Sequence, residues 1–307
     1  AARVMQQSTL LAAGTLVALG LFQDVYAWFA LRFLLGAAGS MLWSASEAVI
    51  NELVDDDWRG RIIGIYGSAG AAGFALGPIV LVLTGTQGLR PFVVTAAFIV
   101  VAMLPLFWLP NEPAAHASDD HPRLRQVFRL VPHIMLLNLT YAAAVEAFIA
   151  FFPLFGIHIG LGEVRSLSLL TTFALGGVFL QLPLGWLADH MRRQRLLLIC
   201  LIITMLGFLV LPHVVSLRVG GPIFVFALGG AEGMIYALGV ILLGQRFRGA
   251  ELAAASVLYT GMWGAGTMLG PAMVGAGMDI LGNASMPYLI AAIYAVYLPV
   301  FFLARRS

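Results

Sequence analysis

The sequence has no lysine, a single cysteine and few charged residues, and each shortage excludes a class of protein. Charged residues make up 10% of the 307 residues and hydrophobic residues 61%. Soluble domains carry about 25% charged residues, so the composition excludes a soluble globular domain. The cysteine, Cys200, lies in an apolar run, which excludes an internal disulfide and is typical of a small buried hydrophobe. The net charge of +2 comes from scattered arginines, which excludes a nucleic-acid-binding face.

Long apolar runs fill most of the chain. A helix needs about 20 apolar residues to cross a membrane, and ten segments are long enough to do so. They cover residues 5–22, 26–51, 62–84, 90–109, 130–154, 166–187, 196–213, 221–245, 252–278 and 286–304. The connections are short, except for a polar stretch at 111–129 that separates four segments from six. The sequence therefore predicts an all-α membrane protein.

The arginines predict the topology. If residue 1 is placed in the cytoplasm and the segments alternate, thirteen arginines fall on the cytoplasmic side and three, Arg90, Arg165 and Arg218, on the opposite side. An excess of basic residues in cytoplasmic loops is the positive-inside rule. All 17 basic residues are arginine, a bias typical of a GC-rich bacterial genome. We therefore expect a multi-pass protein of a bacterial inner membrane.

The chain contains an internal repeat with an offset of 193 residues. Residues 36–43 align with 229–236, and residues 72–78 align with 265–271 with five of seven identical. The offset spans six crossings, so the two copies run in the same direction, as in transporters built from two parallel halves. By this offset, two helices that would precede the chain are missing, and we expect ten helices of twelve. The predicted domains are a remnant of an N-terminal bundle at 1–110, a cytoplasmic linker at 111–129 and a C-terminal six-helix bundle at 130–307.

Four ionisable residues, Arg32, Glu47, Glu146 and Glu232, lie inside apolar segments. A charge in the bilayer costs about 2.5–3.5 kcal/mol on insertion scales, so such residues normally face a polar interior and mark a functional site. Glu232 lies near mid-membrane and is a candidate proton carrier. Arg32 and Glu146 lie at comparable depths in the outer half and are candidates for an ion pair. Glu47 lies near the cytoplasmic end, where pairing with a loop arginine such as Arg59 is an equal alternative.

The loop after the sixth segment carries a signature. Residues 185–195 read Gly-Trp-Leu-Ala-Asp-His-Met-Arg-Arg-Gln-Arg, which resembles the loop motif Gly-x-Leu-Ala-Asp-Arg-x-Gly-Arg-Arg of the major facilitator superfamily. The resemblance implies a gating loop in which Gly185 allows close helix approach and Asp189 lies near a helix terminus. The arginines, Arg193 among them, would pair with Asp189 or with lipid phosphates. Two positions depart from the motif: His190 stands where the motif has Arg, and Arg192 stands where it has Gly. These departures affect the geometry of the turn and the gating role that the resemblance implies for the loop.

Two further motifs extend this resemblance over the whole chain. Arg32, Gly36 and Gly39 resemble the superfamily's helix 4 motif Arg-x-x-x-Gly-x-x-Gly, although helix packing with Arg32 reaching the outer interface is the alternative. Residues 73–78 resemble the first part of the superfamily's helix 5 motif, which is associated with antiporters. The trailing Gly-Gly of that motif is absent here, where Leu81 and Val82 stand, and antiport stays an open implication. Because the motif occurs in both halves, it is more typical of helix packing. The residues that would have this packing role are Gly73, Gly77 and Pro78 in the first copy and Gly266, Gly270 and Pro271 in the second.

The resemblance also implies a cavity lined by helices 1, 4, 7 and 10 of the twelve. Arg32 and Glu47 would lie on helix 4, Glu146 on helix 7 and Glu232 on helix 10. Trp43 and Tyr236 match in the repeat and are candidates to stack on a substrate, with ordinary packing as the alternative.

We therefore expect a monomeric secondary transporter in a lipid bilayer, with a small solute and protons as ligands and no catalytic residue, cofactor or metal. Efflux and uptake both stay open. The alternatives are a polytopic membrane enzyme, a transporter-like sensor and a passive channel.

Overall fold

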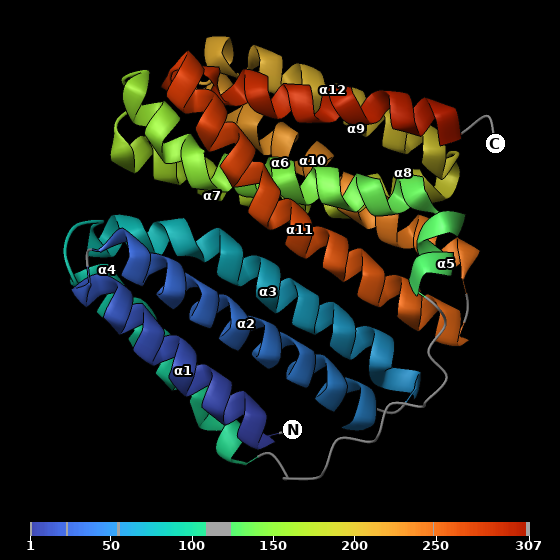
Figure 1. Ribbon diagram of the computed structural model, residues 1–307. Coiled ribbons are helices and arrows are strands. Elements are labelled where there is room, and N and C mark those ends of the chain that lie inside the picture. Colours follow the sequence, from blue (N-terminus) through green and yellow to red (C-terminus); the bar gives the residue numbers. More distant parts are fainter. Residues whose placement is uncertain (1, 23, 54–55, 109–123, 248, 305–307) are drawn as a thin grey trace. The chain divides into compact units, whose positions relative to one another are not determined.

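The structure, a computed structural model, describes residues 2–22, 24–53, 56–108, 124–247 and 249–304. Within these residues every regular element is a helix, which confirms the predicted all-α class (Figure 1). Eight stretches of the described chain are long and apolar enough to cross a membrane. The remaining two predicted spans coincide with α3 (Asp56–Thr84) and α11 (Gly249–Leu281), which are 29 and 33 residues long.

The chain forms two compact units. One comprises Ala1–Gly73 and Ile79–Ala117, and the other Phe74–Pro78 and Ser118–Ser307. We call them the N-terminal and C-terminal units. The N-terminal unit contains α1 (Ala2–Leu21), α2 (Val25–Leu53), most of α3, α4 (Arg90–Met103) and the 3-10 helix η1 (Leu104–Phe107).

Helix α1 of the N-terminal unit packs on α2 and α4. Most of its buried positions are small or hydroxylated, namely Ser8, Thr9, Ala12, Ala13 and Thr15, and the large apolar Met5 and Leu19 are buried as well. The hydroxyl of Thr9 donates to the carbonyl oxygen of Met5, and that of Thr15 to Leu11, at 2.7 and 2.6 Å. Because each hydroxyl bonds within its own helix, these residues can be buried without an unpaired polar group.

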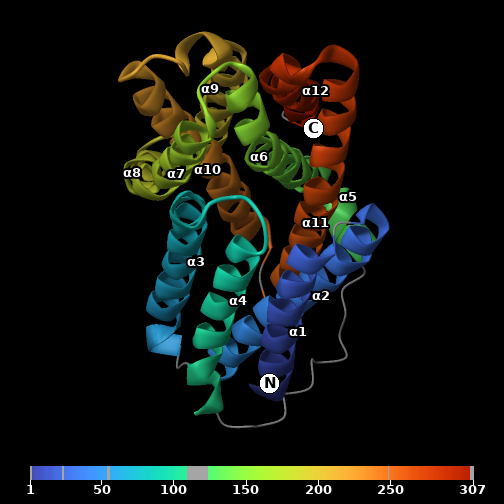
Figure 2. The ribbon, with the colours of Figure 1, turned by 90° about the vertical axis from the view of Figure 1, so that its left-hand side faces the viewer.

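The C-terminal unit contains the rest of the helices. They are α5 (Leu124–Leu130), α6 (Pro132–His158), α7 (Glu163–Phe179), α8 (Gln181–His190), α9 (Arg193–Val214), α10 (Gly220–Arg246), α11, the 3-10 helix η2 (Asn283–Ser285) and α12 (Met286–Ala304). Helix α6 packs most closely on α11, and α10 on α7, and both pairs lie side by side in Figures 1 and 2. Phe148 of α6 contacts Phe152, Phe173 and Phe208 at ring-centroid distances of 4.7, 4.5 and 5.5 Å.

The glycines of the repeated motif behave differently in its two copies. A Cβ at Gly270 of α11 would overlap the backbone of Ala143 on α6, so only glycine allows these helices to approach so closely. This approach is the packing role predicted for the copy at Gly266, Gly270 and Pro271. At Gly73 and Gly77 no described atom lies within 4 Å of an ideal Cβ.

Two details of the C-terminal unit go beyond the sequence-based prediction. Helix α5 lies at 124–130, where a linker was predicted. Val127 of α5 is buried in a cluster with Val131, Ile134 and Leu243. Helix α5 therefore packs on the helices of the C-terminal unit through an apolar contact. The predicted span at 166–187 lies within one apolar stretch, Glu163–His190, long enough to cross a membrane, and this stretch has a break between α7 and α8 at Leu180. Pro183 explains the division, because it has no N–H to donate to the carbonyl four residues earlier.

Candidate functional site

Among the described residues, Glu232 is the one acidic side chain that the C-terminal unit buries completely. It lies on α10 and is 1% exposed. Its Oε1 accepts a 2.9 Å hydrogen bond from the hydroxyl of Tyr294 on α12. Its Oε2 has no hydrogen-bond partner in the described part of the chain. One carboxyl oxygen is therefore held in place while the other can carry a proton without breaking that bond.

Neighbouring helices fix both partners of this pair. The ring of Tyr294 stacks on Phe208 of α9, with centroids 6.3 Å apart and an interplanar angle of 13°. On α10, a Cβ at Gly229 would overlap the carbonyl group of Phe173 on α7. The backbones of α7 and α10 therefore touch one turn before Glu232, which sets the position of its carboxyl group along the helix.

Four aromatic rings gather one turn beyond Glu232. Tyr236 is 38% exposed, and its ring centroid lies 5.6 Å from Tyr141, 5.8 Å from Tyr259 and 5.5 Å from Trp263. The hydroxyl of Tyr259 donates to the carbonyl oxygen of Tyr236 at 3.3 Å. Residues four apart share a helix face, so α10 presents Glu232 and Tyr236 on one side. Rings in this arrangement can stack on a flat solute.

Asn138 of α6 anchors this aromatic group. Its Nδ2 donates a 2.6 Å hydrogen bond to the carbonyl oxygen of Tyr259 on α11, and its side chain is fully buried. Its Oδ1 has no partner in the described chain. A buried amide that pairs with a backbone carbonyl on another helix fixes the register of the two helices.

Glu146 of α6 differs from Glu232. Its side chain is half-buried, and no ion pair of Glu146 occurs among the described residues of the C-terminal unit. The predicted ion pair with Arg32 joins residues of the two units and stays a prediction.

In the N-terminal unit, Arg32 has a partner on its own helix. Its guanidinium carbon lies 5.8 Å from the centroid of the Trp28 ring, a cation–π contact one turn earlier on α2. Trp43, 48% exposed, lies 5.2 Å from the ring of Tyr66 on α3. At Gly36 and Gly39 no described atom lies within 4 Å of an ideal Cβ. The side chain of Glu47 is outside the described part of the chain.

The signature loop forms its predicted ion pair. Arg193 Nη2 lies 3.8 Å from Asp189 Oδ1, across the turn that joins α8 to α9. Arg192 has φ −61° and ψ 117°, so the turn needs no residue with positive φ, and an arginine fits where the family motif has glycine. The His190 ring stacks on Trp186 at 4.2 Å. The close helix approach expected at Gly185 is not made, because no described atom lies within 4 Å of its ideal Cβ.

Comparison with known proteins identifies the class. The model of the Major Facilitator Superfamily matches residues 2–217 and 166–307, and the chain belongs to this superfamily of membrane transporters. The MFS-type transporter YfkF of Bacillus subtilis (strain 168) is 28% identical over 288 residues, which cover 90% of this chain and 73% of YfkF.

Two solved structures have the same fold. The nucleoside transporter NupG matches with a TM-score of 0.76 at 15% identity, over 100% of this chain and 83% of that one. The E. coli fucose:proton symporter FucP matches with a TM-score of 0.61 at 14% identity, over 99% and 83%. The chain is therefore a multi-pass membrane protein with the fold that the loop signature implied.

The sequence did not indicate several residues that contact Glu232 or belong to the aromatic group around Tyr236. Tyr294, Tyr141, Tyr259, Trp263 and Asn138 all lie within predicted spans and were not predicted as site residues. One signal was available for Tyr294 and Asn138, because a tyrosine hydroxyl or an amide inside an apolar span needs a hydrogen-bond partner. The partner itself, on a helix 62 or 121 residues away, had no signature in the sequence.

Proposed function

We propose that this protein is a secondary active transporter that moves a small solute across a bacterial inner membrane by alternating access, coupled to protons. Membership of a transporter superfamily supports the class. The observation that carries the coupling is the buried carboxyl group of Glu232, bonded to Tyr294 through Oε1 and free at Oε2 among the described residues.

The proton has a defined place in this proposal. A charged carboxylate in an apolar surrounding is costly, whereas the neutral acid is not. A proton on Oε2 removes the charge and leaves the hydrogen bond from Tyr294 to Oε1 intact. Binding and release of the proton therefore change the charge on α10 without changing the packing of the helix. A carboxyl group that gains and loses a proton in every transport cycle needs this property.

We propose that the solute contacts Tyr236. Trp43, which matches Tyr236 in the repeat, is a second candidate for contact with the solute. Tyr236 is the exposed member of the group that includes Tyr141, Tyr259 and Trp263. Because Tyr236 lies one turn from Glu232, solute binding at Tyr236 would be coupled to the protonation state of the Glu232 carboxyl group. NupG and FucP are named for a nucleoside and for fucose, and both compounds are reasonable first probes.

The test begins with a solute. Labelled nucleoside, labelled fucose and the compounds found by a toxicity screen of cells lacking the gene are offered to vesicles containing the purified protein. We expect one of them to show saturable counterflow, which separates a carrier from a channel. Flux that rises linearly with concentration, with no counterflow, would contradict the carrier proposal.

Proton coupling is tested with the same solute under a pH gradient imposed in each direction, which distinguishes symport from antiport. We expect Glu232→Gln to abolish the response to the gradient while counterflow continues. Glu251→Gln is the control, since Glu251 is exposed at the start of α11. If Glu232→Gln responds to the gradient like the unmodified protein, Glu232 is not the proton carrier.

A further inference from the structure

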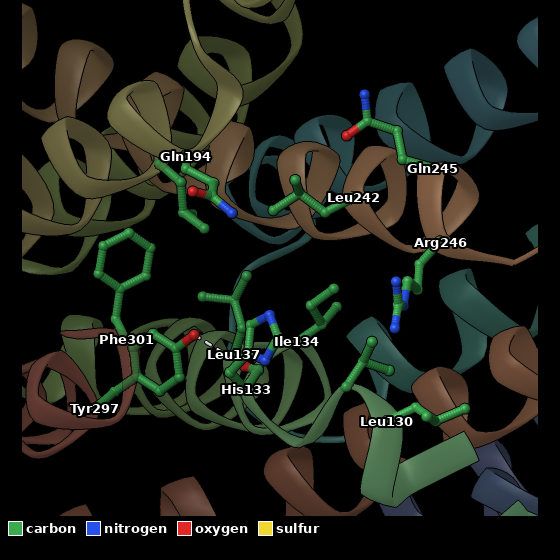
Figure 3. Close-up of a pocket in the computed structure, with 12 residues that line it drawn as sticks. Leu130, His133, Ile134, Leu137, Gln194, Leu242, Gln245, Arg246, Tyr297 and Phe301 are labelled. Carbon is green, nitrogen blue, oxygen red and sulfur yellow. Dashed lines mark hydrogen bonds between the residues drawn. The ribbon is translucent and has the colours of Figure 1, made fainter. Parts of the chain in front are cut away.

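The C-terminal unit contains a second feature that the transport proposal does not use. A cavity of about 400 Å³ lies between the first turns of α6 and α9 and the last turns of α10 and α12 (Figure 3). Ligand-binding pockets typically measure about 300–1,000 Å³, so the cavity is large enough for part of an organic molecule. The buried carboxyl group of Glu232 does not line it.

The inner wall of this cavity is apolar. Ile134 and Leu137 of α6, Leu197 of α9 and Phe301 of α12 line it, and all four are buried. Tyr297 also lines it, and its hydroxyl donates a 2.9 Å hydrogen bond to the carbonyl oxygen of His133. That bond occupies the only polar group of Tyr297, so its ring adds to the apolar surface. The inner wall is suited to a hydrocarbon chain.

The mouth of the cavity is polar and carries a positive charge. Gln194 of α9 and Arg246 of α10 line it and are exposed. Figure 3 shows their side chains on opposite sides of the space, with the side chain of Leu242, also on α10, between them in this view. No ion pair or hydrogen bond of Arg246 occurs among the described residues. A guanidinium group at such a mouth suits an anion, since arginine binds phosphate and carboxylate oxygens through several N–H groups.

The mouth lies at the cytoplasmic end of these helices. Arg192, Arg193 and Arg195 precede or begin α9, and Arg246 ends α10, on the side that the positive-inside rule assigns to the cytoplasm. Anionic lipids are concentrated in the leaflet on that side, and basic pockets between membrane helices bind their head groups. The cavity therefore meets an anionic amphiphile where such molecules are available.

We propose that this cavity binds one anionic amphiphile, with its acidic head group at Arg246 and Gln194 and part of one acyl chain on Ile134, Leu137, Leu197 and Phe301. The shared chemistry is an acidic group attached to a hydrocarbon chain, supplied by a phospholipid of the inner leaflet or by a free fatty acid. Occupancy would join α6, α9, α10 and α12 at their cytoplasmic ends. The inference does not depend on proton coupling or on the identity of the solute.

Binding is measured on the purified protein in neutral detergent, by titration with defined probes and by native mass spectrometry. The probes are dihexanoyl phosphatidylglycerol, dihexanoyl phosphatidylcholine, decanoate and inorganic phosphate. We expect saturable binding of phosphatidylglycerol, of decanoate or of both, at least tenfold tighter than phosphatidylcholine and than phosphate. Preference for phosphatidylglycerol identifies a phospholipid site, and preference for decanoate a fatty-acid site. Equal binding of phosphatidylcholine, or equal binding of phosphate without a chain, would overturn the proposal.

Two variants locate the site. Arg246→Gln removes the charge at the mouth and should weaken binding about tenfold, whereas Arg195→Gln removes an exposed charge near the same membrane surface and should not. Leu242→Trp fills the cavity and should release the bound molecule, whereas Ile199→Trp places the same ring on an exposed face of α9. If Arg246→Gln and Arg195→Gln weaken binding equally, the attraction belongs to the basic surface and the site is refuted. The charge variants decide the question even if Leu242→Trp does not fold.

Discussion

The hydroxyl of Tyr294 donates a 2.9 Å hydrogen bond to Oε1 of Glu232, and the two side chains, from α12 and α10, are 0% and 1% exposed. This pair is the buried contact between an acid and a phenol on which the proposed proton site depends. Its contribution to stability and its contribution to transport can be measured separately.

Removal of the Tyr294 hydroxyl should destabilise the protein. Tyr294→Phe leaves a buried oxygen of Glu232 unpaired, which costs about 1–3 kcal/mol. We expect the free energy of unfolding in mixed micelles to fall by that amount. Tyr288→Phe is the control, because Tyr288 is exposed on the same helix. Equal losses in the two variants would mean that the hydrogen bond to Glu232 contributes nothing.

A double substitution tests whether the pair is kept for function. Replacing both members of a buried polar pair with apolar residues of similar size is often neutral or stabilising. We expect the protein with Glu232→Met and Tyr294→Phe together to regain most of the stability lost by Tyr294→Phe alone, while its transport stays independent of a pH gradient. Unfolding and vesicle transport are measured on the same preparations. A double variant less stable than Tyr294→Phe would show instead that the carboxyl group supports the fold.

The contact between α6 and α11 predicts a contrast between two glycines of one helix. A Cβ at Gly270 would overlap the backbone of Ala143, whereas no described atom lies within 4 Å of a Cβ at Gly264. Overpacking typically costs about 1–3 kcal/mol, so Gly270→Ala should lower the free energy of unfolding by about that much. Gly264→Ala should leave it unchanged or raise it by up to about 1 kcal/mol, because alanine favours a helix. Similar effects at both positions would contradict the close approach.

The ion pair of the signature loop should matter little for stability. Asp189 is exposed and lies 3.8 Å from Arg193 across the turn between α8 and α9, and exposed ion pairs contribute about 0–1 kcal/mol. We expect Arg193→Gln to change the free energy of unfolding by less than about 0.5 kcal/mol and, if the loop gates transport, to lower the transport rate. Arg195→Gln serves as the control. A large loss of stability in Arg193→Gln would show that the loop is structural.

Much of the fold could be predicted because apolar length and arginine placement are local properties of a sequence. The predicted span at 286–304 coincides with α12, and that at 221–245 falls within α10. Glu232 was predicted as a site residue because a carboxyl group inside an apolar span is costly and therefore conspicuous. Its burial and its neighbours are properties of the packed bundle.

The rest could not be predicted, since it depends on contacts between distant segments. Tyr294 is one of several tyrosines in apolar spans, and only packing decides which one meets Glu232. The arginines of α5 predict a linker, while the burial of Val127 on other helices is not visible in the sequence. The division at Leu180 follows from Pro183, a local signal that the length of the apolar run concealed.

Cys200 should be inert in the native protein. Its thiol is on α9, and the residue is 2% exposed, so we expect no reaction with a maleimide until the protein is unfolded. Ser216→Cys, at an exposed position after α9, should react at once. Rapid labelling of the native protein at Cys200 would show that this part of α9 opens to water.

A lone shielded thiol also makes the chain convenient for spectroscopy. Spin labels or fluorophores can be attached to cysteines introduced in pairs at chosen loops, while the natural thiol stays in place and unlabelled. Changes in distance between such labels, followed as solute and protons are added, would report the conformational cycle directly and in real time.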